Sequence, residues 1–325
     1  MMDEGERMSS QRAEEVLGSM KAEIGEVVVG YKDQVDDFLT CLLTDGHLLM
    51  QGVPGVAKTT LSKGFTQVSG LSYRRIQFTQ DLLPADITGH YFYNQKTGEF
   101  EVRKGPLFAS IVLADEINRA PPKTQSALLE AMQERMVTIE GNTFQLPNPF
   151  MVIATLNPIE TEGVYPLPEA QVDRFMIKST MDYLDADSEL SLLKIKSTIA
   201  EPIRAVLTEQ DIVQLRKAVA RVHMHESVMG YVRDLMRASR DLEQLDLGLS
   251  PRGGIHLMFA SKARALLSSR SYVIPDDVKF MAHKVLDHRL ILSPEAELEG
   301  QTQAAITDAL LTSVSAPKGS FKEED

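Results

Sequence analysis

The stretch 52–59, with the sequence GVPGVAKT, constrains the fold of this chain more than any other. It follows a short apolar run at 47–50 and precedes apolar residues at helical spacing over 61–68. A strand, a glycine-bearing loop, a Lys-Thr pair and a helix, in this order, form the layout of a phosphate-binding loop. The loop amides would face an anion, Lys58 would add a charge for the outer phosphates, and Thr59 would offer a hydroxyl to Mg²⁺.

One residue departs from the strict form of this motif, because Ala57 stands where a last glycine is usual. Alanine accepts a right-handed helical backbone, but a left-handed one is strained. We therefore expect helical geometry at Ala57. Taken alone, the motif also allows a tight strand-to-helix turn with a surface lysine and no bound anion.

Two further apolar runs end in polar residues. The run 111–114 is followed by Asp115 and Glu116, and the run 150–155 is followed closely by Asn157. In open α/β sheets, ligands bind beyond the carboxyl ends of the strands. Asp115 therefore suits a position near Mg²⁺, and Glu116 suits the orientation or deprotonation of a water molecule. Asn157 could hold that water or a phosphate, although Asn-Pro taken alone favours a plain turn.

Two arginines have sequence contexts that suggest a role. Arg174 lies in Asp-Arg-Phe at the end of a short helix that begins near 168–169, and Arg252 follows Ser250 and Pro251. Serine at a helix cap with proline at the first helical position predicts that Arg252 lies in a first turn. A cation there opposes the helix dipole, which indicates an anionic partner. Each arginine taken singly is more often a surface residue.

Together these elements resemble a AAA+ ATPase, and more narrowly the MoxR family. The resemblance rests on GVPGVAKT at 52–59, GPLFASIVLADEINRAPPKTQSALLEAMQE at 105–134 and IATLNPIETEGVYPLPEAQVDRF at 153–175. It runs nearly without gaps from about 29 to 175 and continues more loosely beyond 252. The two longer stretches are far more specific than the phosphate loop, and alanine at position 57 is usual in this family.

The resemblance implies a hydrolytic site for ATP and Mg²⁺. Lys58 and Thr59 correspond to the Walker A pair, and Asp115 and Glu116 correspond to the Walker B pair. Thr59 and Asp115 are then the Mg²⁺ ligands, and Asn157 is sensor 1, which assists Glu116 in activating water.

The resemblance also implies residues around the nucleotide. Arg252 is sensor 2, and Arg174 is the arginine finger offered to a neighbouring subunit. Arg119 is a further candidate cation near the subunit boundary, and 28–31 lies where such proteins line the adenine pocket. The residues expected to contact the nucleotide are Val29, Gly30, Val53, Pro54, Gly55, Val56, Ala57, Lys58, Thr59, Thr60 and Asp115.

Composition limits the classes of partner and the compartment. The net charge is −12, from 34 basic and 46 acidic residues, which disfavours broad electrostatic binding to nucleic acid but leaves a local basic channel open. The one cysteine, Cys41, cannot form an intrachain disulfide and is expected as a small apolar residue in a reducing compartment. No apolar run approaches a membrane span, and 1–11 is polar and unlike a signal peptide. We therefore expect a cytoplasmic protein without membrane insertion.

The pattern of elements predicts an α/β fold in two domains. Residues 1–184 are expected to form a P-loop AAA+ nucleotide-binding domain, with an N-terminal helix over 11–28, a mainly parallel five-stranded sheet covered on both faces, and two β-hairpin insertions. Residues 185–325 are expected to form an α-helical lid beside the nucleotide site, with Arg252 aimed into it. The strands are expected near 47–51, 73–78, 110–115, 150–155 and 174–178, and the later lid helices near 251–268, 275–286 and 302–315.

The two hairpins are expected at Tyr91–Val102 and at 137–145. They would either face a central pore or partner, or only cover the sheet. His223 and His225 have a spacing that metal sites use, but capping or solvated histidines are favoured because no cysteine or matching cluster lies nearby. The tail Lys318–Asp325 is expected to be disordered.

The resemblance implies an ATP hydrolase that works in a ring, with six subunits as the expected number. Proteins like MoxR are taken to remodel or mature a client protein or complex, in the manner of a chaperone, often with a partner that bears a von Willebrand factor A domain. Two other classes stay open. One is a DNA-dependent motor of helicase type, and the other is a nucleotide-gated binding scaffold with little turnover.

Overall fold

The computed structural model describes residues 10–26, 28–159, 163–196 and 204–322. A five-stranded sheet has the order β2-β5-β8-β1-β9, and all its neighbours are parallel. Its strands are β1 (Leu48–Gly52), β2 (Tyr73–Gln77), β5 (Ile111–Asp115), β8 (Met151–Leu156) and β9 (Ile177–Met181). The predicted α/β class and the parallel five-stranded sheet are confirmed.

The last strand was predicted three residues too early. The amides of Arg174 and Phe175 donate to the carbonyls of Gln171 and Val172, so these residues continue the turns of the short helix α6 (Glu169–Val172). The strand β9 begins only after Met176, whose amide donates to the carbonyl of His47. Phe175 is apolar because it is buried, not because it lies in a strand.

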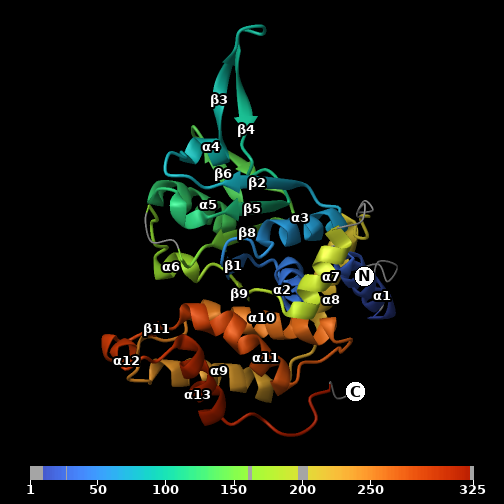
Figure 1. The fold of residues 1–325 in the computed structure, drawn as a ribbon, viewed down its shortest axis with the longest axis vertical. Coiled ribbons are helices and arrows are strands. Elements are labelled where there is room, and N and C mark those ends of the chain that lie inside the picture. Colours follow the sequence, from blue (N-terminus) through green and yellow to red (C-terminus); the bar gives the residue numbers. More distant parts are fainter. Residues whose placement is uncertain (1–9, 27, 160–162, 197–203, 323–325) are drawn as a thin grey trace, which may run out of the picture.

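Helices cover both faces of the sheet, as β5 requires because all five of its residues are buried. One face packs against α1 (Ser10–Gly25), α2 (Lys32–Leu43) and α3 (Lys58–Ser69), and the other face packs against α4 (Pro84–Thr88) and α5 (Pro122–Glu134). Alternate residues of β5 face opposite ways, so that Leu113 joins the first core and Val112 joins the second. Figure 1 shows α3 and α5 on either side of the sheet.

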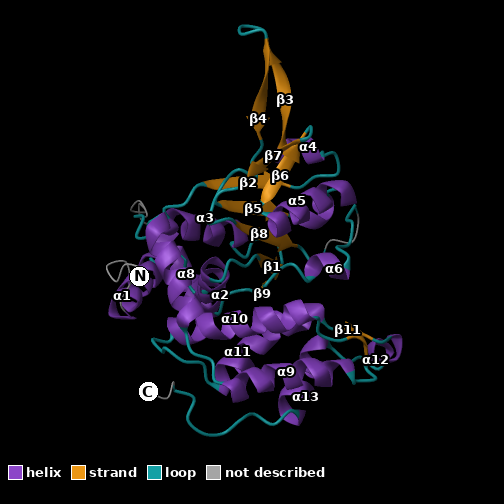
Figure 2. Ribbon diagram, turned by 180° about the vertical axis from the view of Figure 1, so that it is seen from behind, coloured by secondary structure: helices purple, strands orange, loops and turns teal. Residues whose placement is uncertain are grey.

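Both predicted hairpins are confirmed. The longer one, β3 (Gly89–Asn94) with β4 (Glu99–Lys104), projects far beyond the body of the molecule in Figures 1 and 2, and the shorter one pairs β6 (Met136–Ile139) with β7 (Asn142–Gln145). Asn142 donates a hydrogen bond of 2.8 Å to the hydroxyl of Tyr91, which ties the two hairpins together near the base. The side chains of Tyr93 and Phe100 pack with ring centroids 5.4 Å apart and are 54% and 71% exposed.

The C-terminal part is mainly helical. Its elements are α7 (Ala186–Lys196), α8 (Glu209–Arg221), α9 (Glu226–Arg240), β10 (Leu245–Leu247), α10 (Pro251–Leu267), α11 (Pro275–Leu286), η3 (Asp287–Arg289), β11 (Ile291–Leu292), α12 (Pro294–Leu298) and α13 (Gln303–Ser313). The lid helices expected from the sequence are present. The β10–β11 pair was not predicted, because strands of two or three residues have no periodicity to detect.

The lid is fixed to the first domain through α2. Lys284 of α11 donates to a carboxylate oxygen of Asp37 at 2.6 Å, and Ser179 of β9 donates to the other oxygen at 2.7 Å. Arg264 of α10 lies 3.4 Å from Asp36, and one continuous apolar core joins α2 to α8, α10 and α11. Burial raises the pKa of Asp37 to about 6, although Lys284 acts in the opposite direction. A buried, hydrogen-bonded pair of this kind is costly to break, so the lid and the sheet form one unit.

Three minor sequence predictions have clear outcomes. Cys41 is fully buried, and burial raises the pKa of its thiol, so its apolar role is confirmed. His225 caps α9 by accepting a hydrogen bond from the amide of Ser227, and the part of the chain that the structure describes holds no cluster of metal-ligating side chains.

The tail differs from prediction, because Phe321 is partly buried against the lid core. Positions 323–325 lie outside the described residues, and no described helix is long and apolar enough to cross a membrane.

Candidate functional site

The sheet brings the predicted site residues to one edge. Ala154 of β8 pairs with Leu49 of β1 on one side and with Ala114 of β5 on the other. The phosphate loop, the Asp115–Glu116 pair and Asn157 therefore follow three adjacent parallel strands. Because neighbouring strands lie about 4.8 Å apart, the loop and Asp115 are separated by roughly 10 Å, which leaves room for a phosphate and a metal ion.

Lys58 is the first residue of α3, and its side chain spans the phosphate loop. The ammonium group donates to the carbonyl of Gly52 at 2.5 Å and to the carbonyl of Leu156 at 3.3 Å. These carbonyls belong to the ends of β1 and β8, so the charge lies between the loop and the strand that leads to Asn157. This position suits contact with the outer phosphates of a nucleotide.

The expected helical geometry at Ala57 is wrong. Ala57 has φ 63° and ψ 22°, which is left-handed, and Gly55 also has a positive φ of 89°. A left-handed alanine costs roughly 1–2 kcal/mol. Such conformations turn successive backbone amides into a concave anion-binding surface, so the strain is stored where a phosphate would contact the loop.

Asp115 is buried at the end of β5 and is held by two residues that sequence reasoning missed. Thr155 donates to one carboxylate oxygen at 2.6 Å, and the guanidinium of Arg75 donates to the other at 2.7 and 3.1 Å. The hydroxyl of Thr155 also accepts from the amide of Glu116 at 2.8 Å, so this one side chain orients both carboxylate residues. Thr155 lies within the predicted strand and Arg75 lies on β2, and neither position carries a motif that would have revealed its role.

Glu116 has a left-handed backbone with φ 57°. Its carboxylate accepts from Gln77 at 2.8 Å and lies 3.2 Å from the guanidinium of Arg119. Arg119 thus pairs with Glu116, and its expected place near a subunit boundary stays a prediction. Gln77 was missed. Asn157 is 5% exposed, and its side-chain oxygen accepts from the amide of Ile159 at 3.3 Å.

A hollow beside the phosphate loop matches the expected adenine pocket in position. Its lining residues are Val28, Val29, Tyr31, Gly55, Val56, Ala57, Thr60, Tyr183, Leu184, Glu189 and Leu192. The hydroxyl of Tyr31 donates to the carbonyl of Asp182 at 3.2 Å and so ties two of its walls together. Tyr183 and Leu184 precede α7, and Glu189 and Leu192 lie within it. All four were missed, because only the tertiary fold brings them to the loop. Gly30, Val53, Pro54 and Thr59 were expected near the nucleotide but do not line this hollow.

The two candidate arginines make different contacts. Arg174 donates to the carbonyl of Leu129 on α5 at 2.7 Å, and its Nε has no hydrogen-bond partner among the described residues. Arg252 lies 3.4 Å from the carboxylate of Asp173, the residue directly before Arg174. Neither arginine lines the adenine hollow. Arg252 thus contacts Asp173 in this structure, and its expected role as sensor 2 stays a prediction.

The residues present suit a magnesium ion bound together with a nucleotide. Mg²⁺ in phosphate sites usually takes one or two protein oxygens, with the remaining positions filled by phosphate and water. Thr59 and Asp115 can supply these oxygens at the edge described above. Because both oxygens of Asp115 already accept hydrogen bonds, contact through a water molecule requires the least rearrangement.

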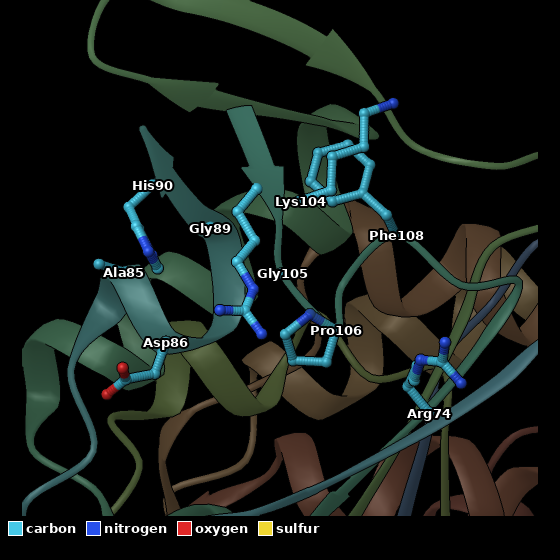
Figure 3. Close-up of a pocket in the computed structure, with 10 residues that line it drawn as sticks. Arg74, Ala85, Asp86, Gly89, His90, Lys104, Gly105, Pro106 and Phe108 are labelled. Carbon is cyan, nitrogen blue, oxygen red and sulfur yellow. The ribbon is translucent and has the colours of Figure 1, made fainter. Parts of the chain in front are cut away.

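Another hollow lies at the base of the long hairpin. It holds about 540 Å³ and is lined by Arg74, Ala85, Asp86, Gly89, His90, Arg103, Lys104, Gly105, Pro106 and Phe108. Figure 3 shows Arg74 and His90 on opposite sides of it, and Lys104 beside the ring of Phe108, with its ammonium 4.8 Å from the ring centroid. It shares no lining residue with the hollow beside the phosphate loop.

Comparison with known proteins identifies the family. Residues 47–177 match a family described as ATPase family associated with various cellular activities (AAA), and residues 237–310 match the AAA lid domain. Chaperone MoxR1 of Mycobacterium tuberculosis is 41% identical over 305 residues, which cover 91% of this chain and 81% of that protein. Protein MoxR of Paracoccus denitrificans is 30% identical over 324 residues, which cover 91% of this chain and 95% of that protein. The chain belongs to the MoxR family of AAA+ ATPases.

Two further similarities cover most of the chain. YeaC of Bacillus subtilis is 46% identical over 304 residues, which cover 93% of this chain and 95% of that protein. The crystal structure of a candidate ATPase from Cytophaga hutchinsonii superposes with a TM-score of 0.90 at 42% identity and covers 95% of this chain and 97% of its own. The predicted MoxR family and the AAA+ core with a helical lid are thus confirmed.

Proposed function

We propose that this MoxR-family chain hydrolyses ATP at a site completed by a neighbouring subunit in a ring. The observation that carries the proposal is the separation of two sets of residues. Lys58, Asp115 and Glu116 lie at one edge of the sheet, whereas Arg174 and Arg252 lie on a surface outside the adenine hollow. A second subunit would bring such arginines to the first set.

The chemistry then follows from the geometry of one subunit. Lys58 and the loop amides would hold the phosphates. Thr59 and Asp115 would hold Mg²⁺, which when bound would supply positive charge for the phosphate oxygens. Glu116 orients and deprotonates the attacking water, with Asn157 as its helper. Gln77 and Arg119 both contact one carboxylate oxygen of Glu116, Oε2, and so orient the side chain.

The arginines supply the charge that stabilises the transferring phosphoryl group. Arg174 directly follows Asp173 in the chain, and Arg252 contacts the carboxylate of Asp173, so a single docking event would bring both to the neighbour's ATP. A closed ring repeats the same interface at every boundary, and we propose a hexamer.

We propose that hydrolysis remodels or matures a client protein, in the manner of a chaperone. The name Chaperone MoxR1, carried by a relative, supports this class. The exposed pair Tyr93 and Phe100 near the end of the long hairpin provides an apolar anchor of the kind that protein interfaces use. The partner class is a client complex that includes a protein with a von Willebrand factor A domain.

Hydrolysis is tested by the release of phosphate from ATP. The full chain is expected to release phosphate only when Mg²⁺ is present. Lys58→Ala should weaken ATP binding about 10- to 100-fold, because a charge-assisted contact to the phosphates is lost. Titration with a fluorescent ATP analogue measures the binding. Equal affinity in wild type and Lys58→Ala would show that this loop does not hold the phosphates.

Client binding is tested by affinity capture with Glu116→Gln and ATP, which should hold the ring in its ATP state and raise client occupancy. The double substitution Tyr93→Ser and Phe100→Ser should abolish capture of the same protein while the ring still assembles. Leu298→Ser is the matched control, because Leu298 is 89% exposed on α12 within the lid. Capture of the same protein with or without nucleotide would contradict the remodelling proposal.

One observation favours the alternative of a DNA-dependent motor. The hollow at the base of the hairpin gathers Arg74, Arg103 and Lys104 within a chain whose net charge is −12. Double-stranded DNA binding that weakens steeply with salt, and that stimulates phosphate release, would support the motor. Absence of both effects at low salt would exclude it.

A further inference from the structure

Arg289 of the lid holds the chain on both sides of Arg174. Its Nε donates to the carboxylate of Asp173 at 2.9 Å, and its Nη2 donates to the carbonyls of Asp173 at 3.1 Å and Phe175 at 2.6 Å. Its Nη1 reaches the carbonyl of Met176 at 3.3 Å. A single buried guanidinium, 6% exposed, thus binds the segment Asp173–Met176 that contains the arginine finger.

The surroundings of Arg289 suit a permanent cation. Burial lowers the pKa of Arg289 to about 10, and Asp173 opposes that effect, so the group stays protonated at neutral pH. His256 and His288 lie 2.6 and 2.7 Å from its nitrogens. Burial, together with the charge of Arg289, lowers the pKa of His256 to about 3 and that of His288 well below its usual value, so both rings are neutral. Because a guanidinium only donates hydrogen bonds, both rings accept from it and hold its plane.

Arg289 is itself fixed by lid elements. Its Nη1 donates to the carbonyl of Val285 on α11, and the adjacent Asp287 accepts a hydrogen bond of 2.6 Å from Thr307 on α13. The same helix α11 carries Lys284, which pairs with Asp37 of α2. The backbone position of Asp173–Met176 is therefore set by the lid and not by the sheet alone.

Asp173 also binds the start of α10. Ser250, the cap of this helix, lies 3.3 Å from both carboxylate oxygens, and Arg252 lies 3.4 Å from one of them. The carboxylate of Asp173, the residue directly before Arg174, thus contacts both Arg289 and Arg252.

We propose that Arg289 is the positioning residue of the arginine finger, and that through it the lid sets where Arg174 is presented to the neighbouring subunit. This inference rests on the proposed function. Arg289 does not line the hollow beside the phosphate loop. It acts through the backbone carbonyls at 173, 175 and 176, while the side chain of Arg174 rests on Leu129 of α5. Loss of the Arg289 contacts would free the segment 173–176 from the docked lid and so misplace the finger.

The test is Arg289→Lys, which keeps the charge but lacks the planar fork needed to span these acceptors. ATP affinity and KM are expected to stay at the wild-type values. We expect kcat in the assembled ring to fall about 100-fold, the effect typical of a catalytic group displaced by 1 Å. Arg270→Lys is the matched control, because Arg270 forms a similar forked pair with Asp277 of the lid but does not contact 173–176.

Mixed rings show whether Arg289 positions the arginine finger or instead supports the ATP site of its own subunit. Arg289→Lys mixed with Lys58→Ala should regain activity, because the second variant keeps its finger and the first keeps its site. Arg289→Lys mixed with Arg174→Ala should regain nothing, because both lack a working finger. The reverse pattern, or a kcat equal to wild type, would overturn the proposal.

A second variant and a reference variant keep the result clear. Asp173→Asn removes the charge that Arg289 binds, and it is expected to give the same kcat loss and the same mixing pattern. If Arg289→Lys does not fold, wild-type turnover by Asp173→Asn overturns the proposal. Failure of the proposed function would give a different result from failure of the positioning role, because Arg174→Ala would then hydrolyse ATP at the wild-type rate. If Arg174→Ala hydrolyses ATP slowly but Arg289→Lys has the wild-type kcat, the proposed function stands and only the positioning role of Arg289 is overturned.

Discussion

Replacing Glu116 with glutamine is expected to lower ATP hydrolysis about 10²–10⁴-fold, the range typical of general acid–base catalysis. Glutamine keeps the shape of the side chain and can still contact Gln77, but it cannot accept the proton of the attacking water. ATP binding should stay nearly unchanged, because the phosphates are held by Lys58 and the loop. Phosphate release and titration with a fluorescent ATP analogue measure the two effects separately.

A matched control removes a carboxylate far from the site. Glu243 is exposed beside β10 in the lid, and Glu243→Gln should hydrolyse ATP as the wild type does. Hydrolysis by Glu116→Gln at the wild-type rate would show that another group activates the water. A parallel loss of ATP binding would instead place Glu116 in nucleotide binding.

Removal of Arg174 is expected to have the largest effect on the rate. An arginine finger typically contributes about 10³–10⁵ in kcat, so Arg174→Ala should bind ATP nearly normally and hydrolyse it slowly. The physical reason is that the guanidinium compensates charge that develops on the phosphoryl oxygens in the transition state. Steady-state phosphate release at saturating ATP measures this loss.

Subunit mixing tests whether Arg174 serves a neighbour. Lys58→Ala lacks a working site but keeps its finger, so mixing it with Arg174→Ala should restore part of the activity once subunits exchange. Arg233→Ala is the control, because Arg233 is an exposed arginine on α9 paired only with the adjacent Asp234 among the described contacts. Rates that merely add on mixing would assign Arg174 to its own subunit's site or place it outside the chemistry.

Much of the candidate site could be predicted because its chemistry is local in the sequence. The phosphate loop and the Asp115–Glu116 pair each combine a buried strand with polar residues at its carboxyl end. Strands of a parallel sheet share that edge, so their ends meet without any knowledge of the loops between them. Short apolar runs predicted the five strands. The last strand was placed too early because Phe175 is apolar and buried but lies in a turn.

The partners of these residues could not be predicted, because each comes from a distant part of the chain. Arg75 and Thr155 reach Asp115 across the sheet, and neither position differs in sequence from an ordinary strand residue. At Ala57, the backbone conformation and not a distant partner could not be predicted. Local preference predicts a helical alanine, but the loop geometry imposes a left-handed one.

The sequence by itself determined the family, the parallel sheet and the residues that can hold phosphate, because these depend on local patterns of burial and on the chemistry of single side chains. Only the tertiary structure decided where the lid lies and what its arginines face. Burial against α2, with the Lys284–Asp37 pair, docks the lid so that Arg252 and Arg289 meet Asp173. These contacts join residues more than 70 positions apart. Those of Asp37 and Arg289 form because an isolated buried charge is too costly to leave without a partner.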